Sequence, residues 1–261
     1  MVLLVIMGIV IAGYPGKSQP KHTNSAPGTQ VITPQVAIAE GQDYLINNPK
    51  LTDTHQLLVL DYLFRAYNIK DDFSAQKHPI TIASKDGETR DELLALQRIA
   101  YPSQTVKTIN TNSSPVTQAA NCDHIPLPHN YSQLLQASFQ QGGYEMTHVA
   151  FSIQIAKELG CHVIADEALR PQLRAGLTAL VEDKKSPQDL RYEAIAFLGY
   201  LGYKDDIQKP WIDQIVSEQQ ADGNWISGNS NPTDHATVLA LWALLVYTQP
   251  NTQQEPLIHR S

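Results

Sequence analysis

Three histidines occupy related places in this sequence, because each directly follows a threonine or an aspartate. The segments Thr-Asp-Thr-His, Glu-Met-Thr-His and Pro-Thr-Asp-His end at His55, His148 and His235. An imidazole can act as a general acid or base, or as a metal ligand, near neutral pH. We therefore expect His148 and His235 to be catalytic groups, and all three histidines are candidate ligands of a divalent metal such as zinc.

Two glutamates accompany these histidines and complete the predicted catalytic set. Glu145 lies three residues before His148, and Glu193 lies 45 residues after His148 and 42 residues before His235. A histidine beside a carboxylate can form an acid–base pair that needs no metal. A zinc site would instead need three or four ligands in one place. Both alternatives stay open, together with a third in which the histidines only make structural hydrogen bonds.

Aromatic residues close to the same positions are candidates for contact with a substrate. We expect Tyr144, Tyr192, Trp225 and His55 to bind it, because aromatic rings and polar groups at the mouth of a cavity are typical of binding sites. The alternative for each tyrosine is ordinary packing at the rim, and Trp225 also belongs to a turn motif described below.

The elements that must position these residues are helices. From Pro34 onward, apolar residues recur with helical spacing, which predicts helices near residues 35–48, 52–70 and 89–101. The segment from Pro102 to His129 has no clear period and is expected to be either a lid or a tether. Three helical hairpins follow, and the second helix of each is the more apolar, so it should be the inner one.

The hairpins repeat, and the repeat predicts the fold. Aligning the second helices places His148, Glu193 and His235 at equivalent positions, and a period of 40 to 45 residues with two helices per unit is typical of helical repeat arrays. The chain is therefore expected to be all-α, with repeated helical hairpins that form an α/α toroid or an incomplete one. In a toroid, the N-termini of the inner helices converge on one mouth, where the histidines would meet.

The helix starts themselves carry capping residues. Thr54, Thr147 and Asp234 are predicted N-caps, because their side-chain oxygens can accept backbone N–H groups. A cation at a helix N-terminus is disfavoured by the helix dipole, so a histidine placed there should stay neutral. A neutral imidazole suits a metal ligand or a general base.

A turn before the last helix resembles a motif of a known superfamily. Gln219, Asp222, Gly223 and Trp225 form the pattern Q-x-x-D-G-x-W, which is similar to that of the terpenoid-cyclase and prenyltransferase α/α toroids. The segment Gln140–His148 looks like a second, eroded copy. The resemblance implies a toroid in which the glutamine ties the end of an outer helix to the next inner helix. The chain has no D-x-D-D run, which leaves isoprenoid processing a distant alternative.

The two cysteines, Cys122 and Cys161, are expected to form a disulfide. The helix that starts near Thr147 rises ~20 Å between His148 and Cys161, so Cys161 should lie at the end opposite the histidines. Cys122, just before the preceding helix, can reach that end. A disulfide fits an exported protein, and two free structural thiols are the alternative.

The beginning of the chain favours export. Residues 1–14 are mostly apolar but shorter than the roughly 20 residues that span a bilayer, which indicates a signal peptide or membrane anchor. Residues 15–34 have a Pro/Ser-rich linker composition, residues 35–249 would form the toroid domain, and residues 250–261 a C-terminal tail. The domain should lie outside the cytoplasm, in the periplasm or beyond, touching a membrane only through the N-terminal segment.

Several functions agree with these features. The net charge is −7 and no Lys/Arg cluster exists, so nucleic acid is not an expected partner. We expect an exported enzyme that acts on a small molecule or glycan, including uronic acids, by hydrolysis or elimination. The alternative is a non-catalytic envelope protein that binds a partner or acts as a scaffold.

Overall fold

The computed structural model describes residues 32–47, 54–69, 87–101, 104, 113–227, 234–249 and 255–260, which all belong to one compact unit. The predicted signal segment and nearly all of the linker lie outside the described residues. None of the described helices is both long enough and apolar enough to cross a lipid bilayer. The described residues contain no β-strand, which confirms the all-α class. Their α-helices are α1 (Pro34–Asn47), α2 (Thr54–Ala66), α3 (Gly87–Leu96), α4 (Pro115–Ala119), α5 (Tyr131–Gln141), α6 (Gly143–Glu158), α7 (Asp166–Glu182), α8 (Gln188–Tyr200), α9 (Lys209–Glu218) and α10 (Asp234–Thr248), and two 3-10 helices follow α3 (Gln97–Ile99) and α8 (Lys204–Asp206).

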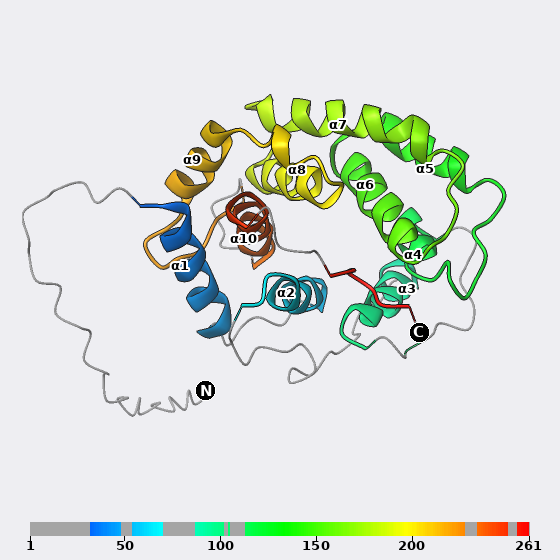
Figure 1. Cartoon of the computed structure of the whole chain (residues 1–261), viewed down its shortest axis with the longest axis horizontal. Helices are drawn as coiled ribbons and strands as arrows, with labels where there is room; N and C mark the ends of the chain where they lie inside the picture. Colours follow the sequence, from blue (N-terminus) through cyan, green and yellow to red (C-terminus); the bar gives the residue numbers. More distant parts are fainter. Residues whose placement is uncertain are drawn as a thin grey trace, which may run out of the picture. The chain divides into compact units, whose positions relative to one another are not determined.

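Burial separates two kinds of helix. In α7 the buried residues are Leu169, Leu173, Leu177 and Val181, which form a single stripe at every fourth position. In α8 every residue from Asp189 to Tyr200 is buried, and α10 is buried along almost its whole length. Figure 1 accordingly shows α1, α9, α7 and α5 on the outside, with α10, α8 and α6 nearer the middle and α2 below α10.

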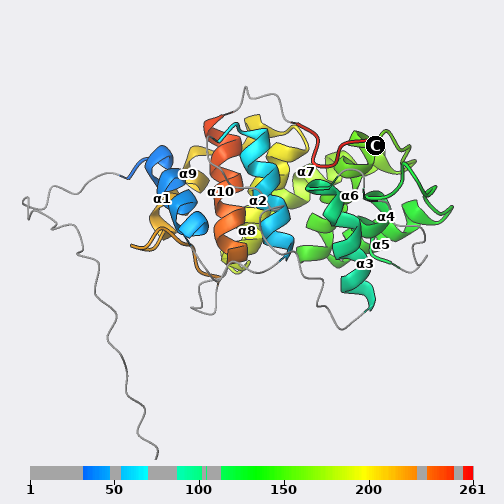
Figure 2. The ribbon, with the colours of Figure 1, turned by 90° about the horizontal axis from the view of Figure 1, so that it is seen from below.

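The more central helices contact one another in a closed series. α6 contacts α8, α8 contacts α10, and α10 contacts α2, which contacts α3; α3 contacts α4, and α4 returns to α6. Figure 2 shows α10 and α2 side by side in this series. Helices that are far apart in the sequence are therefore brought around a common centre.

The Q-x-x-D-G-x-W turn joins three helices. The side-chain amide of Gln219, at the end of α9, donates to the carbonyl of Ala37 in α1 at 2.9 Å and to that of Gly223 at 3.0 Å. The indole of Trp225 donates to the carbonyl of Ile215 at 2.7 Å, and its backbone N–H donates to Thr237 in α10 at 3.1 Å. The prediction that Trp225 binds substrate is corrected here, because this side chain is fully buried in the structural turn.

Replacing Gly223 by alanine should destabilise the fold by about 3 kcal/mol or more. Gly223 has a φ of 89°, which costs an L-residue roughly 1–2 kcal/mol, and an added Cβ would lie 2.4 Å from the backbone oxygen of Glu40. Gly202 is a matched control, because its φ is 93° and a Cβ there would meet nothing within 4 Å. Urea unfolding of both variants should show the larger loss of stability for Gly223→Ala. Equal losses would mean that the close contact of Gly223 with Glu40 of α1 does not contribute to stability.

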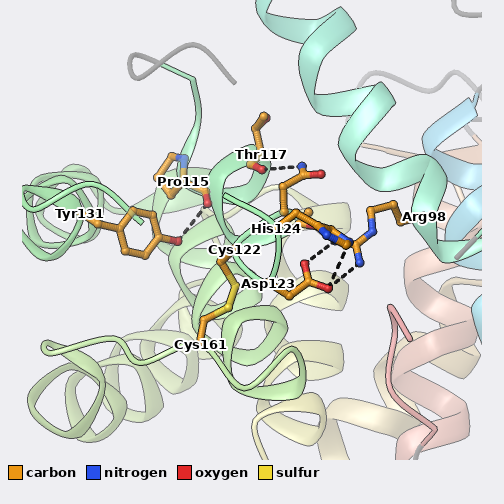
Figure 3. The surroundings of a disulfide bond; sticks show 10 residues. Arg98, Pro115, Thr117, Cys122, Asp123, His124, Tyr131 and Cys161 are labelled. Atoms are coloured by element: carbon orange, nitrogen blue, oxygen red, sulfur yellow. Dashed lines mark hydrogen bonds and ion pairs between the residues drawn. A yellow bond between two sulfur atoms is a disulfide. The ribbon is translucent and has the colours of Figure 1, made fainter. Parts of the chain in front are cut away.

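A disulfide closes the α4–α6 region, as the sequence predicted. Cys122 and Cys161 are bonded, with their Cα atoms 6.1 Å apart (Figure 3). Cys122 follows α4, and Cys161 follows α6. The segment 102–129, expected to be a lid or a tether, includes the short helix α4. That helix begins after Ser114, whose side chain accepts the backbone N–H of Thr117.

A buried ion pair lies next to the disulfide. Arg98 is fully buried and donates to both carboxylate oxygens of Asp123 at 2.7 Å, and to the carbonyl of Ala120 at 2.6 Å (Figure 3). Burial alone would raise the pKa of Asp123, but the hydrogen bonds and charge of Arg98 lower it overall. The turn after α4 is thus held by one covalent bond and one bidentate ion pair.

The C-terminal segment is packed into the compact unit rather than forming a separate tail. Leu257 and Ile258 are fully buried. The backbone N–H of Leu257 donates to Glu158 at 2.8 Å, and Glu255 pairs with Arg65 at 3.0 Å. Because Glu158 ends α6 and Arg65 lies in the last turn of α2, the described part of this segment covers the C-terminal ends of these two helices.

Candidate functional site

A cavity of about 270 Å³ lies among the helices of the closed series. Side chains from α2, α3, α4, α6, α8 and α10 line it, so every helix of the series contributes. The three predicted histidines are all present, and Glu193 lies with them. The lining residues are His55, Gln56, Val59, Glu92, Leu96, Val116, His148, Phe151, Glu193, Phe197, His235, Val238, Leu239 and Trp242.

The lining is divided by position along each helix. A polar residue precedes an apolar one by three or four residues in each of five helices, which places the two on the same helix face about one turn apart. These pairs are His148 with Phe151, Glu193 with Phe197, His235 with Val238 and Leu239, His55 with Val59, and Glu92 with Leu96.

Two contacts link polar rim residues of α2 to polar rim residues of α10 and α3. Gln56 of α2 and His235 of α10 are 2.9 Å apart between Nε2 and Nδ1. Glu92 of α3 lies 3.6 Å from Nε2 of His55 and accepts a hydrogen bond from Ser114 at 2.9 Å. The cavity therefore has a polar end and an apolar interior.

The apolar interior is largely aromatic. Phe151 and Phe197 are stacked with their ring centroids 5.3 Å apart. Trp242 lies edge-on to Phe197, with centroids 5.4 Å apart. Aromatic pairs at such distances are stabilising and hold one another in place, so they form a firm wall for a bound molecule.

Glu193 is the most perturbed acidic group of the cavity. Burial raises its pKa, a hydrogen bond with Thr147 lowers it and the charge of Asp189 raises it, and the net result is a pKa of about 8. Its Oε2 atom is buried and has no hydrogen-bond partner among the described residues. At pH 7 the folded protein therefore holds Glu193 mainly as the uncharged acid, which can give up a proton. The contact with Thr147 places it beside the residue that precedes His148.

The histidines differ in their partners. The amide nitrogen of Gln56 can only donate, so Nδ1 of His235 accepts, and a neutral His235 carries its proton on Nε2. His55 faces the carboxylate of Glu92. The carbonyl of His148 accepts a hydrogen bond from Ser152, but its imidazole has no hydrogen-bond partner among the described residues. Of the three, His148 is thus the one best placed to accept a proton from a bound molecule.

Besides Trp225, three predicted site residues do not line the cavity. Glu145 lies one turn nearer the start of α6 than His148. Tyr144 is partly exposed and donates its hydroxyl to Asp189 at 2.8 Å. Tyr192 is the neighbour of Glu193, and successive helical residues point in different directions, so it donates instead to Glu218 of α9. The expectations for these residues, made from spacing alone, are corrected accordingly.

The start of α6 also differs from the prediction. Thr147 was expected to be an N-cap, but α6 begins at Gly143 after the Gly142–Gly143 turn. Thr147 is the fifth residue of the helix, and its hydroxyl donates to the carbonyl of Tyr144 at 2.8 Å. The expected cap is therefore wrong, and His148 lies more than a turn inside the helix.

The predicted metal site is not formed by the part of the chain that the structure describes. No group of three or more His, Cys, Asp or Glu side chains is placed there to hold a metal ion. The three histidines belong to three different helices, α2, α6 and α10. His55 and His235 instead face Glu92 and Gln56.

Two residues of the rim were not predicted from the sequence. Gln56 follows His55, and its position beside a candidate site residue was the only available signal. Glu92 lies in a predicted helix that carries no motif, and only the contacts of α3 with α2 and α4 bring it to the cavity. Comparisons with protein-family models, curated proteins and solved structures find no match to this chain. The roles of these residues therefore rest on their own geometry and chemistry.

Proposed function

We propose that the protein is an exported enzyme of the α/α-toroid type that binds a small molecule in the cavity and acts on it by general acid–base catalysis. The observation that carries the proposal is the buried carboxyl of Glu193, whose Oε2 has no hydrogen-bond partner among the described residues and which lines the same cavity as His148. Perturbed carboxyl groups in a cleft are typical of catalytic sites. The Cys122–Cys161 disulfide fits an oxidising compartment outside the cytosol.

The two groups have complementary roles in this proposal. His148 accepts a proton from the substrate or from an attacking water molecule. Glu193 donates a proton to the leaving group, and the aromatic wall holds the substrate in place. Such a pair serves either hydrolysis or elimination. Gln56 is a positioning residue in this proposal, because its amide fixes which nitrogen of the His235 imidazole carries the proton.

Substituting either group should lower kcat by roughly 100-fold or more, which is the usual contribution of a general acid or base. The test is turnover by the full chain of a panel of neutral glycosides, uronides and carboxylic esters. Glu193→Gln and His148→Ala should lose activity while KM changes little. Glu145→Gln, on α6 but outside the cavity, is the matched control and should stay active.

A non-catalytic binding protein is the second candidate, and the mainly apolar lining of the cavity favours it. Saturable binding of panel members by the wild-type protein, with no turnover of any of them, would support that candidate and contradict the catalytic proposal. Activity that Glu193→Gln retains in full would contradict the role assigned to Glu193.

A further inference from the structure

The charges around the cavity restrict what it can bind. None of its described lining residues is lysine or arginine. The carboxylate of Asp189 is buried close to Glu193, and Glu92 lies in the lining itself. A carboxylate ligand would therefore enter a site with acidic neighbours and without a fixed cationic partner, which is costly for a desolvated charge.

A cationic ligand is not matched either. Glu193 holds a proton at pH 7 because its pKa is raised to about 8, so it offers a countercharge only after that proton is given up. Glu92 is already engaged, because it accepts from Ser114 and faces His55. The starts of α2 and α10 lie at the same rim, where the helix dipoles disfavour a cation by the same modest amount by which they favour an anion. An uncharged ligand meets none of these costs.

The helices α6 and α8 offer such a ligand two levels. His148 and Glu193 lie at the polar level, where a head group that both donates and accepts hydrogen bonds finds partners. One turn further along the same two helices, the stacked rings of Phe151 and Phe197 form the apolar level, and Trp242 closes it on the side of α10.

We propose that the cavity selects a compact, uncharged molecule with an apolar ring and one hydrogen-bonding head group. The head group lies at His148 and Glu193, and the ring lies against Phe151, Phe197 and Trp242. This inference rests on the proposed function and names its substrate class: neutral ring compounds, with ionised acids such as uronates excluded.

Four matched probes test the selection on the full chain at pH 7. They are benzamide, with a neutral head group; benzoate, an anion; benzylamine, a cation; and toluene, which has no head group. Dissociation constants come from NMR titration, with the indole signal of Trp242 as reporter. We expect benzamide to bind at least 10-fold more tightly than benzoate and benzylamine, and more tightly than toluene.

Three variants separate the two levels. His148→Leu should abolish the preference for benzamide over toluene while toluene binding is kept. Phe197→Leu should weaken benzamide and toluene alike, by about fivefold or more. Phe139→Leu is the matched control, because Phe139 lies on α5 outside the cavity, and it should change neither.

The outcomes distinguish this inference from the catalytic proposal. Benzoate or benzylamine binding as tightly as benzamide would overturn the selection of uncharged ligands. No saturable shift with any probe would overturn it as well. The expected binding pattern, combined with no turnover in the substrate panel, would uphold this inference and contradict only the proposal of catalysis.

Discussion

Replacing Glu193 by glutamine should make the protein more stable at pH 7, by on the order of 3 kcal/mol. The buried carboxyl has a pKa of about 8 in the folded protein, against an ordinary value of 4.5. Between these two values the unfolded chain releases the proton and the folded chain keeps it. The stability that the proton provides is therefore complete below pH 4.5 and is lost as the pH rises to 8. Glutamine has a similar shape and never ionises, so it removes this loss.

Urea unfolding at several pH values between 5 and 8 checks this expectation. Wild-type stability should fall across that range by more than the stability of Glu193→Gln. Glu145→Gln, which leaves the cavity unchanged, should follow the wild-type curve. Parallel curves for the wild type and Glu193→Gln would contradict the perturbed carboxyl. Together with a loss of activity, a gain in stability would be typical of a residue kept for function at the expense of the fold.

The helices were predictable because their information is local. The four-residue stripe of Leu169, Leu173, Leu177 and Val181 defines both the helical state of α7 and the face that it buries. The uninterrupted apolar composition of α10 likewise indicates a helix buried on all sides. The disulfide was predictable too, since helix length places Cys161 at a known end of its hairpin.

The candidate site was predictable only in part. A repeat period fixes how far along its helix a residue lies, but not the direction in which its side chain points. His148, Glu193 and His235 recur at similar distances and all line the cavity. Tyr192 differs from Glu193 by one position, yet that step rotates the side chain by about 100° and directs it to α9. The sequence interval also could not distinguish Glu145 from Glu193 as the cavity carboxyl.

Residues brought in by long-range contacts were beyond prediction. Glu92 reaches the cavity only because α3 packs between α2 and α4, and no local pattern specifies that. Leu257 and Ile258 belong to a short polar segment, but their side chains are fully buried, and the backbone N–H of Leu257 donates to Glu158 at the end of α6. A tail was the natural prediction from composition, since only the tertiary structure supplies its partners.

Breaking the Cys122–Cys161 disulfide should cost about 4 kcal/mol, the chain-entropy value for a loop of this size. The cysteines are 39 positions apart, and the loop between them contains α5 and all of α6. Since α6 carries His148 and Phe151, the loss should reach the cavity as well as the global stability. Urea unfolding of the oxidised chain, the reduced chain and the Cys122→Ser/Cys161→Ser variant measures this loss of stability. The reduced chain and the variant should have the same free energy of unfolding.

The neighbouring ion pair determines how far that loss spreads. Arg98 still holds Asp123 when the disulfide is open, so the turn after α4 should stay closed and the reduced chain should stay folded. Arg98→Met leaves the carboxylate without its partner and should itself cost about 3 kcal/mol. Cys122 and Asp123 are adjacent in the chain. The loss of stability when both contacts are removed should therefore differ from the sum of the two separate losses. If the losses instead add, or if oxidised and reduced chains unfold at the same urea concentration, the two contacts do not secure the α4 turn together.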